Sequence, residues 1–583
     1  MGRTRKKGDG YLRKVINFII WFLMIPIILY LFLSSLFGTC VMVYTNIYTY
    51  YLTDIMPGML LLLVLLVFLL LRHREKVMHD DRTVRKIFLL ITGIWLAALL
   101  VFIFSTQMPP TADQRHVYEG ARELLAGNYN RWLPGHYFYE YPFQSGIVLL
   151  YCPFLLLFQN SAYLAIACFN VCCWFLTICI LTDLTGHWFG KKSARLVYLL
   201  LLAFLPIWGY CTFVYGTVPG LFFAMAGIWF AEKYGRTGKR RNIVGCCICM
   251  PLAIMWKSNF EIFLVGVCIM LLLYAIRKKV LFPLLAVVLI TVCCLTVIQG
   301  VPRLMTQITG QASDQGMPTV AWVAMGMQEA STAPGWYNGY GKTVYESNGN
   351  HPEIVEKIAT ENLKKSIRNF QTNKEYAVSF FGKKIASIWN DPAFEGFTIV
   401  NTRDYVKSLS PWMKDILYDG GVENALLLVF FDVLHSIVLG GVVLHLLLNR
   451  KKLNFETAVA EIIFTGGFIF HIFWEAKCQY TVPYYILLFP YAAAGYTSVV
   501  DRLANLRKAG VRSKKEMLAK ISRTGSGKLA IALAVLILLI AILPGKLLSD
   551  TVKLGGQEKD YVWYCLHKTQ WQSPDYVRYG DNE

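Results

Sequence analysis

Long apolar segments recur along most of this 583-residue chain, and short polar or basic segments separate them. An apolar run of about 18 or more residues is long enough to cross a bilayer as a helix, in which every backbone polar group is satisfied internally. The pattern predicts an all-α polytopic membrane protein with about 13 transmembrane helices. The predicted spans are 15–37, 55–71, 87–104, 162–184, 196–211, 218–231, 243–256, 260–274, 281–298, 425–448, 458–473, 482–499 and 529–543.

Composition agrees with this pattern. The chain is 56% hydrophobic and only 16% charged, whereas soluble domains are about a quarter charged. The first apolar run has no small-residue cleavage site after it, so we expect a true span rather than a removable signal.

The basic residues indicate the orientation of the chain. Its formal net charge is +20, from 57 Lys and Arg against 37 Asp and Glu. About 35 of these basic residues flank the spans, as cytoplasmic loops should. They lie in 3–14, 72–86, 191–195, 233–241, 277–279, 450–452 and 502–528. The charge is therefore mostly a topological signal and does not indicate a nucleic-acid partner. We expect a multi-pass protein of the cell membrane with a cytoplasmic N-terminus and an extracytoplasmic C-terminus.

The apolar run 146–158 decides the topology of the first half of the chain. It is only 13 residues long, which is short for a bilayer. If it crossed the membrane, the basic segments 191–195 and 233–241 would lie outside. We therefore expect an interfacial helix along the outer membrane surface.

These choices divide the chain into five parts. They are an N-terminal two-span extension (1–86), a transmembrane module (87–299) with a first outer loop (105–161), an extracytoplasmic loop or small domain (300–423), a C-terminal transmembrane module (424–546) and an extracytoplasmic tail (547–583). The part 300–423 carries 12 basic and 13 acidic residues, unlike the basic cytoplasmic loops. Within it we expect a turn at 335–341 and a helix over 352–370.

The cysteines do not indicate a metal or disulfide framework. Most of the 15 lie within apolar runs, where they act as small hydrophobic residues. The sequence has no pair of CxxC motifs and no Cys/His spacing typical of a zinc site, so we expect no firm cofactor and no zinc site.

The first outer loop contains the polar, aromatic segment TADQRHVYEGARELLAGNYNRWLPGHYFYEYPFQ, residues 111–144. The helical spacing of its apolar residues predicts a helix from about residue 114 to 125, ending at Gly127. Asp113 would stand at the start of this helix. Aspartate is a favoured N-cap residue, but a carboxylate at a membrane surface also marks chemistry. The two roles do not exclude each other.

Other polar candidates share the predicted outer face. Lys257 and Glu261 lie near the outer end of one hairpin of spans, and Glu475, Lys477, Gln479 and Tyr480 lie at the outer turn of another. A lysine at a span end is often only a snorkelling anchor. Glu140 and Gln144 precede the expected interfacial helix, where ordinary loop polarity is the alternative.

The order of these motifs resembles the GT-C glycosyltransferases, in particular the protein O-mannosyltransferase and aminoarabinose-transferase type. The resemblance covers about 87–499 and leaves the first two spans as an addition. Its residues are Asp113-Gln114, Tyr118, Ala121, 124–127, Tyr141-Pro142, IMWKSNF at 254–260 and AKCQYTVPYY at 476–485.

This resemblance implies a donor sugar on polyprenyl phosphate and transfer outside the membrane. It assigns Asp113 as the base that deprotonates the acceptor hydroxyl, with Lys257 and Lys477 as candidates to hold the phosphate. The further substrate-binding candidates are Gln114, Arg115, Glu140, Tyr141, Gln144, Glu475 and Tyr480.

The chain also departs from the family pattern. Gln114 follows the acid where many members carry a second acidic residue, which weakens the case for a metal site and leaves metal dependence open. The outer turn VYGTVPG at 214–220 lacks a frequent aspartate, and Lys477 stands where arginine is expected. The identity of the donor sugar therefore cannot be inferred from the resemblance.

The sequence thus predicts an inverting membrane glycosyltransferase for a hexosyl or pentosyl group. Its partners would be the bilayer, the polyprenyl-phosphate-linked sugar and an extracytoplasmic glycan, lipid or protein acceptor. A carrier or flippase of a lipid-linked saccharide is the alternative, because it also needs polar groups at an outer cavity. A glycan polymerase or ligase shares the topology.

Overall fold

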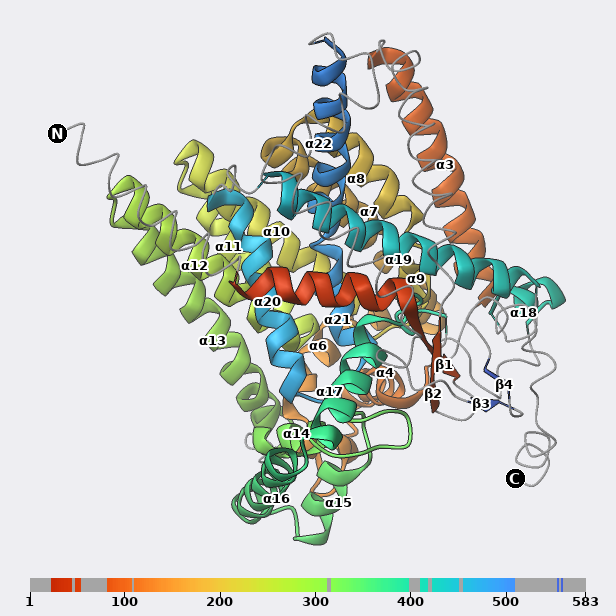
Figure 1. The fold of residues 1–583 in the computed structure, drawn as a ribbon. Coiled ribbons are helices and arrows are strands. Elements are labelled where there is room, and N and C mark those ends of the chain that lie inside the picture. Colours follow the sequence, from red (N-terminus) through yellow and green to blue (C-terminus); the bar gives the residue numbers. More distant parts are fainter. Residues whose placement is uncertain are drawn as a thin grey trace.

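The computed structural model describes residues 22–43, 48–53, 81–106, 110–311, 316–397, 409–417, 422–449 and 455–508, together with two short strands near the C-terminus. These residues form a mainly helical molecule (Figure 1). The predicted spans 55–71 and 529–543 lie outside the described residues, as does most of the tail 547–583.

Most helices of the membrane modules follow the predicted spans, but the predicted span 482–499 is divided between two helices. The helices of these modules are Phe22–Phe37, α3 (Asp81–Thr106), α7 (Ala162–Phe189), α8 (Lys191–Ala203), α9 (Pro206–Thr212), α10 (Thr217–Thr237), α11 (Arg241–Trp256), α12 (Glu261–Lys278), α13 (Phe282–Thr309), α19 (Val422–Asn449), α20 (Phe455–Phe473), α21 (Cys478–Ile486) and α22 (Phe489–Lys508).

Five described helical segments are long and apolar enough to cross a membrane, or six if a bent pair is one span. The expected count of about 13 thus remains a prediction. The bent pair is α8 and α9, whose axes differ by 61°. The bend lies just before Pro206, because proline lacks the N–H that a continuous helix needs and disfavours helical backbone before it.

The first outer loop folds into short helices. They are α4 (Ala112–Leu125), η2 (Asn130–Trp132), α5 (Tyr137–Glu140), η3 (Pro142–Gln144), α6 (Ser145–Phe158) and η4 (Gln159–Ser161). The predicted helix after the acid is confirmed, but the expectation that Asp113 caps it is wrong. Thr111 occupies the N-cap position, and Asp113 lies in the first turn. Helix α6 has 14 residues, about 21 Å at 1.5 Å per residue, and its orientation relative to a membrane stays a prediction.

Short strands depart from the all-α expectation. Strands β1 (Gly38–Val43) and β2 (Tyr48–Thr53) form an antiparallel hairpin in which Gly38 pairs with Thr53 and Val43 with Tyr48. Their β-branched and aromatic residues favour extended backbone. The hairpin also contacts a distant segment of the chain, because Cys40 N donates a hydrogen bond to Asn390 O over 3.1 Å. A second pair joins β3 (Lys553–Leu554) and β4 (Gln557–Glu558).

The predicted extracytoplasmic part contains α14 (Thr319–Gly326), α15 (Tyr340–Ser347), α16 (Pro352–Thr372), α17 (Lys374–Trp389) and α18 (Pro411–Leu417). The helix expected over 352–370 is confirmed as α16. Helices α14–α16 enclose a small core of their own around Ala321, Tyr345 and Val355. They lie together at the lower end of the molecule in Figure 1.

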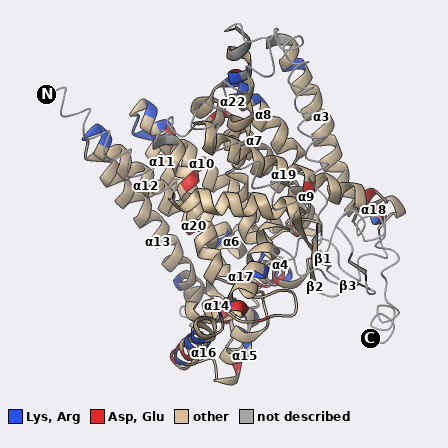
Figure 2. Cartoon of the chain, in the orientation of Figure 1, with Lys and Arg blue, Asp and Glu red and all other residues tan. Residues whose placement is uncertain are grey.

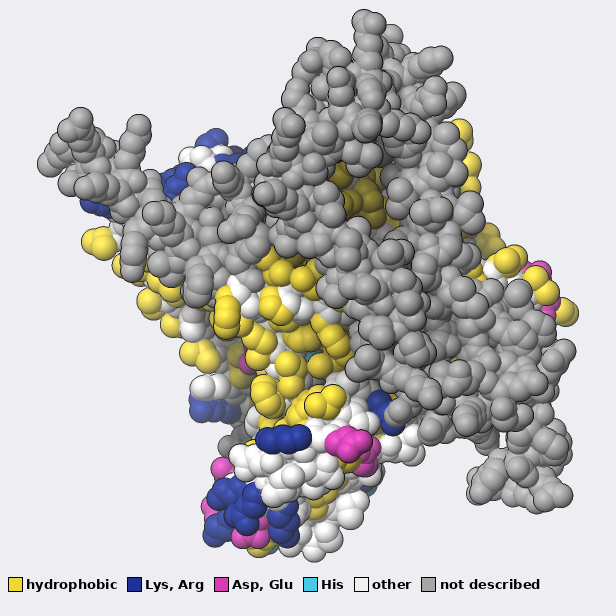
Figure 3. All heavy atoms as spheres, in the orientation of Figure 1, with side chains coloured by type: hydrophobic (Ala, Val, Ile, Leu, Met, Phe, Trp, Pro, Cys, Tyr) yellow, Lys and Arg dark blue, Asp and Glu magenta, His cyan; other side chains and the backbone are white. Residues whose placement is uncertain are grey.

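Charge and apolar surface are distributed as a membrane protein requires. Figure 2 shows Lys and Arg at the upper ends of α3 and α12 and again on α16, whereas the helices between are nearly free of charge. Figure 3 shows hydrophobic side chains gathered over α13 and α20, above the charged surface of α16. Val288 and Val292 on α13 are both more than half exposed, as expected for helices that face lipid.

Candidate functional site

The site is centred on Lys257, at the break between α11 and α12. Lys257 leaves the helical path with extended backbone (φ −161°, ψ 123°), and the 3-10 helix η5 (Ser258–Phe260) follows it. This break turns the side chain into the protein, where it is only 9% exposed. Its Nζ donates to Thr217 Oγ1 over 3.0 Å and to Gln479 Oε1 over 3.2 Å.

Two tyrosine rings complete the surroundings of this ammonium group. Lys257 Nζ lies 4.8 Å from the ring centre of Tyr215 and 5.2 Å from that of Tyr480. The negative faces of aromatic rings attract a cation. Gln144 extends the arrangement, because its Nε2 donates to the Tyr215 hydroxyl over 2.6 Å. A buried cation is thus held by neutral partners rather than by a direct ion pair.

The segment between α20 and α21 brings Glu475 and Lys477 to the same place. Ala476 N donates to Gly335 O over 2.8 Å. Lys384 on α17 is fully buried, and its Nζ donates to Ile472 O over 2.9 Å and to Trp474 O over 2.8 Å. The backbone on both sides of Glu475 is therefore fixed by the predicted extracytoplasmic part.

No other residue type could replace Gly335 in this contact without strain. Its backbone has φ +78°, which glycine adopts without steric cost. A Cβ there would lie 2.6 Å from Lys384 Cε and 2.7 Å from Gly326 O. The glycine at the start of the turn expected at 335–341 therefore lets this backbone approach the segment around Glu475 closely.

The charges of these groups act on one another. Burial, together with repulsion from the Lys477 ammonium, lowers the pKa of Lys257 to about 7, while Asp113 opposes the shift. Burial raises the pKa of Glu475 to about 7, against the attraction of Lys477. The two lysines and two acids therefore form one electrostatic cluster.

Asp113 is the least constrained member of this cluster. It lies in the first turn of α4, where a carboxylate is stabilised by the helix dipole. The side chain is partly exposed. Within the described part of the chain it makes no hydrogen bond or ion pair, although its charge raises the pKa of both Lys257 and Glu475. A carboxylate that is near the lysines but has no partner is available to a ligand.

Gln114, one of the substrate-binding candidates, lies inside the protein. Its side chain is fully buried, and its Oε1 accepts from the Tyr163 hydroxyl over 2.8 Å and from Val214 N over 3.1 Å. Its Nε2 donates to Thr111 Oγ1 over 3.0 Å. Gln114 therefore ties the first turn of α4 to α7 and to the segment before Tyr215.

The remaining predicted residues divide between the cluster and its surroundings. Tyr141 contacts Tyr137 and Trp322 through its ring, at centroid distances of 5.0 and 6.1 Å. Arg115 is exposed on α4. Glu140 is buried and interacts with Lys342 and Glu346 of α15. Burial raises its pKa to about 7.

Two acids that the sequence did not single out approach the cluster from 391–396. Gln479 N donates to Glu395 Oε2 over 3.2 Å, and Glu395 N donates to Asp391 Oδ2 over 2.9 Å. Burial raises the pKa of Glu395 to about 7, and the Lys477 charge opposes this. Phe394 and Glu395 have φ values of +48° and +56°, a backbone conformation that is strained for residues other than glycine. No local pattern marked this acid pair, because 300–423 has balanced charge throughout.

The described residues include no group of three or more His, Cys, Asp or Glu side chains that could hold a metal ion. The arrangement instead offers one accessible carboxylate, two ammonium groups and several hydroxyls. Such a set can accept a proton from a hydroxyl and bind a phosphate.

No family model and no curated protein matches the sequence. Among solved structures, it is similar to ArnT from Cupriavidus metallidurans bound to undecaprenyl phosphate, with 15% identity, a TM-score of 0.32, and coverage of 72% of this chain and 79% of that chain. It is also similar to the archaeal oligosaccharyltransferase AglB from Archaeoglobus fulgidus in complex with an inhibitory peptide and a dolichol-phosphate. That match has 15% identity, a TM-score of 0.34, and coverage of 84% of this chain and 59% of that chain.

Both proteins are GT-C superfamily membrane glycosyltransferases, the family that the sequence motifs resemble. Their TM-scores are low. The function proposed below therefore rests on the residues of the site itself.

Proposed function

We propose that this protein is a membrane glycosyltransferase that moves a sugar from a polyprenyl-phosphate donor to a hydroxyl of an extracytoplasmic acceptor. One observation carries the proposal. Asp113 is a partly exposed carboxylate without a partner among the described residues, and its charge acts on the buried Lys257. A carboxylate that can accept a proton and a cation that can bind phosphate thus belong to the same candidate site.

Asp113 is the proposed base. It takes the proton of the acceptor hydroxyl as the hydroxyl oxygen forms a bond to the anomeric carbon. The bond from that carbon to the phosphate oxygen breaks, and polyprenyl phosphate leaves with the electron pair. Base catalysis of this kind contributes about 10²–10⁴-fold to a rate. A single displacement inverts the anomeric carbon.

Lys257 and Lys477 are the proposed phosphate ligands. A lysine ammonium has three donors, and Lys257 directs two of them to Thr217 and Gln479. The third is left for a phosphate oxygen. Polyprenyl phosphate is a stable anion, so a cation near it suffices and no general acid is required. Glu475, Tyr480, Tyr141 and Gln144 would shape the pocket around the sugar, whereas Gln114 would position Asp113.

Incubation of the purified protein with a panel of polyprenyl-phosphate monosaccharides and candidate acceptors tests this function. We expect release of free polyprenyl phosphate, coupled to glycosylation of the acceptor, with at least one donor. Release only from polyprenyl-diphosphate-linked glycans would indicate a polymerase or ligase instead. No release from any donor would contradict the proposal.

One feature of the structure supports the carrier alternative. Asp432 on α19 and Glu461 on α20 are buried within the helices of the C-terminal membrane module, and ionisable groups at such positions often mark transport paths. Neither carboxylate oxygen of Glu461 has a hydrogen-bond partner among the described residues. If the protein moved lipid-linked saccharides across vesicles without forming product, and Glu461→Gln stopped that movement, the carrier function would be correct.

A further inference from the structure

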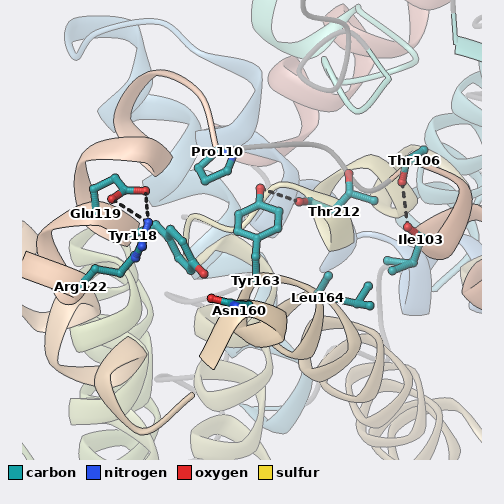
Figure 4. A pocket seen from close by; sticks show the side chains of 11 residues that line it. Ile103, Thr106, Pro110, Tyr118, Glu119, Arg122, Asn160, Tyr163, Leu164 and Thr212 are labelled. Carbon is teal, nitrogen blue, oxygen red and sulfur yellow. Dashed lines mark hydrogen bonds and ion pairs between the residues drawn. The ribbon is translucent and has the colours of Figure 1, made fainter. Parts of the chain in front are cut away.

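A cavity lies on the other side of α4 from Asp113. It has a volume of about 360 Å³ and opens between the end of α3, the side of α4 and the start of α7 (Figure 4). Arg122 lines it nine residues after Asp113, half a turn further around a helix of 3.6 residues per turn. The cavity is therefore distinct from the cluster around Lys257.

The floor of the cavity is apolar and lies at the end of a candidate span. Ile103 comes from the last turn of α3, and Leu164 and Ala167 come from the first turns of α7. Phe104, the neighbour of Ile103, is half exposed, as a lipid-facing side chain would be. In the predicted topology this floor lies at the boundary between hydrocarbon and headgroups.

The mouth of the cavity carries both signs of charge. Glu119 and Arg122 on α4 form an ion pair with a shortest N–O distance of 3.3 Å, and Figure 4 shows them side by side. Asn160 is exposed next to the apolar floor, and its side chain makes no hydrogen bond in the part of the chain that the structure describes. A ligand can therefore meet a cation, an anion and a neutral amide together.

We propose that this cavity binds the headgroup of a zwitterionic phospholipid. The phosphate would lie at Arg122 and Asn160, and the ammonium group at Glu119. The glycerol and upper acyl carbons would cover Leu164 and the other floor residues. An anionic headgroup would gain Arg122 but would also meet the Glu119 carboxylate. The balanced pair therefore favours a headgroup that carries both charges.

The wall of the cavity connects it to the proposed active site. Tyr163 lines the cavity, and its hydroxyl donates to Gln114 Oε1, which also accepts from Val214 N. Gln114 precedes the cavity-lining turn of α4 and follows Asp113 directly. A lipid packed on Tyr163 would stabilise the first turn of α4, and with it the position of Asp113.

The test measures which lipids the purified full-length protein retains. The protein is exchanged into nanodiscs with equal parts of a phosphoethanolamine lipid, a phosphoglycerol lipid and a hexosyl-diacylglycerol, then extracted, and its bound lipids are quantified by mass spectrometry. We expect several-fold enrichment of the phosphoethanolamine lipid. Glu119→Gln and Arg122→Gln should each abolish it, and the charge-swapped double variant Glu119→Arg with Arg122→Glu should restore it.

The matched control is the exposed ion pair between Lys192 on α8 and Asp501 on α22, which lies far from the cavity. Lys192→Gln and Asp501→Asn should leave the enrichment unchanged. Exposed ion pairs contribute little to folding, so all of these variants should fold. Enrichment that persists in both Glu119→Gln and Arg122→Gln would overturn the proposal. Preferential retention of the phosphoglycerol lipid or of the hexosyl lipid would also overturn it.

Discussion

At the scale of single residues, Lys257 has the most specific environment in the proposed site. It is buried at a helix break, donates to Thr217 and Gln479, and forms no direct ion pair with any residue that the structure describes. Burial lowers the pKa of Lys257 to about 7, so the group changes charge in the physiological range. A bound phosphate would raise that pKa again, because it supplies the missing negative charge.

This predicts a pH-dependent affinity for the donor. Below pH 7 Lys257 is protonated before the donor binds, so its own contribution to the affinity should be constant. Above pH 7 the free site must take up a proton, so affinity should fall about tenfold per pH unit until the pKa of the complex is reached. The dissociation constant of a non-transferable polyprenyl-phosphate sugar analogue, measured from pH 6 to 9, checks this. Lys257→Met should bind more weakly and show no such slope, and a flat wild-type profile would refute the assignment.

Sequence reasoning named part of the candidate site and did not name the rest, for physical reasons. Asp113, Lys257 and Lys477 were predicted because charged residues stand out at the ends of apolar runs. Glu395 was missed because only the fold brings it to Gln479, which lies 84 positions away. The burial of Gln114 depends equally on distant partners, Tyr163 and Val214, which no local pattern reveals.

At the scale of elements, the position of the segment 474–477 depends on α17. Lys384 Nζ donates to three backbone carbonyls, of Gly326, Ile472 and Trp474. The hydrogen bonds of a charged donor are stronger than those of a neutral one. Nothing in the periodicity of α17 distinguished this lysine from the exposed lysines of α16, because its role depends on where α20 ends.

Lys384→Met should therefore destabilise the protein and its site together. Each buried carbonyl left without a donor costs about 1–3 kcal/mol. We expect a lower thermal unfolding temperature and weaker donor binding, because Glu475 and Lys477 lose their support. The control Lys365→Met, at an exposed position on α16, should unfold like the wild type. Equal unfolding temperatures for the two variants would show that the carbonyl contacts are not needed.

The close approach of α9 to the strained segment 391–396 gives a second prediction at this scale. A Cβ at Gly209 would lie only 1.4 Å from Gly396 O, so the two backbones could not keep this contact. Gly209→Ala should displace Glu395 and lower both the unfolding temperature and transfer activity. Gly382→Ala on α17 meets nothing within 4 Å and should be neutral or slightly stabilising. A Gly209→Ala variant with wild-type stability and activity would contradict this packing.

At the scale of the whole molecule, the apolar pattern predicted the helices well and their arrangement poorly. Most described membrane helices lie within a few residues of the predicted spans, because apolar runs and basic flanks are local signals. The hairpin β1–β2 contacts the distant residue Asn390, and the bend between α8 and α9 lies just before a single proline, Pro206. Local periodicity could not reveal them.

The predicted topology is testable by cysteine labelling. A membrane-impermeant maleimide applied to intact cells should label Glu356→Cys on α16, because that helix is expected outside. Lys239→Cys, in the basic connection between α10 and α11, should be labelled only after the membrane is opened. Both positions are exposed, so a difference reflects the side of the membrane. The reverse result would move the site to the cytoplasmic face.

The central claim is that Asp113 is the base of a sugar transfer, and single-turnover release of polyprenyl phosphate tests it most directly. Asp113→Asn keeps the size and polarity of the side chain but cannot take the acceptor proton. We expect its transfer rate to fall about 10²–10⁴-fold, with donor affinity nearly unchanged. The control Asp415→Asn, at an exposed position on α18, should transfer like the wild type. An Asp113→Asn variant that transfers sugar at the wild-type rate would contradict the account.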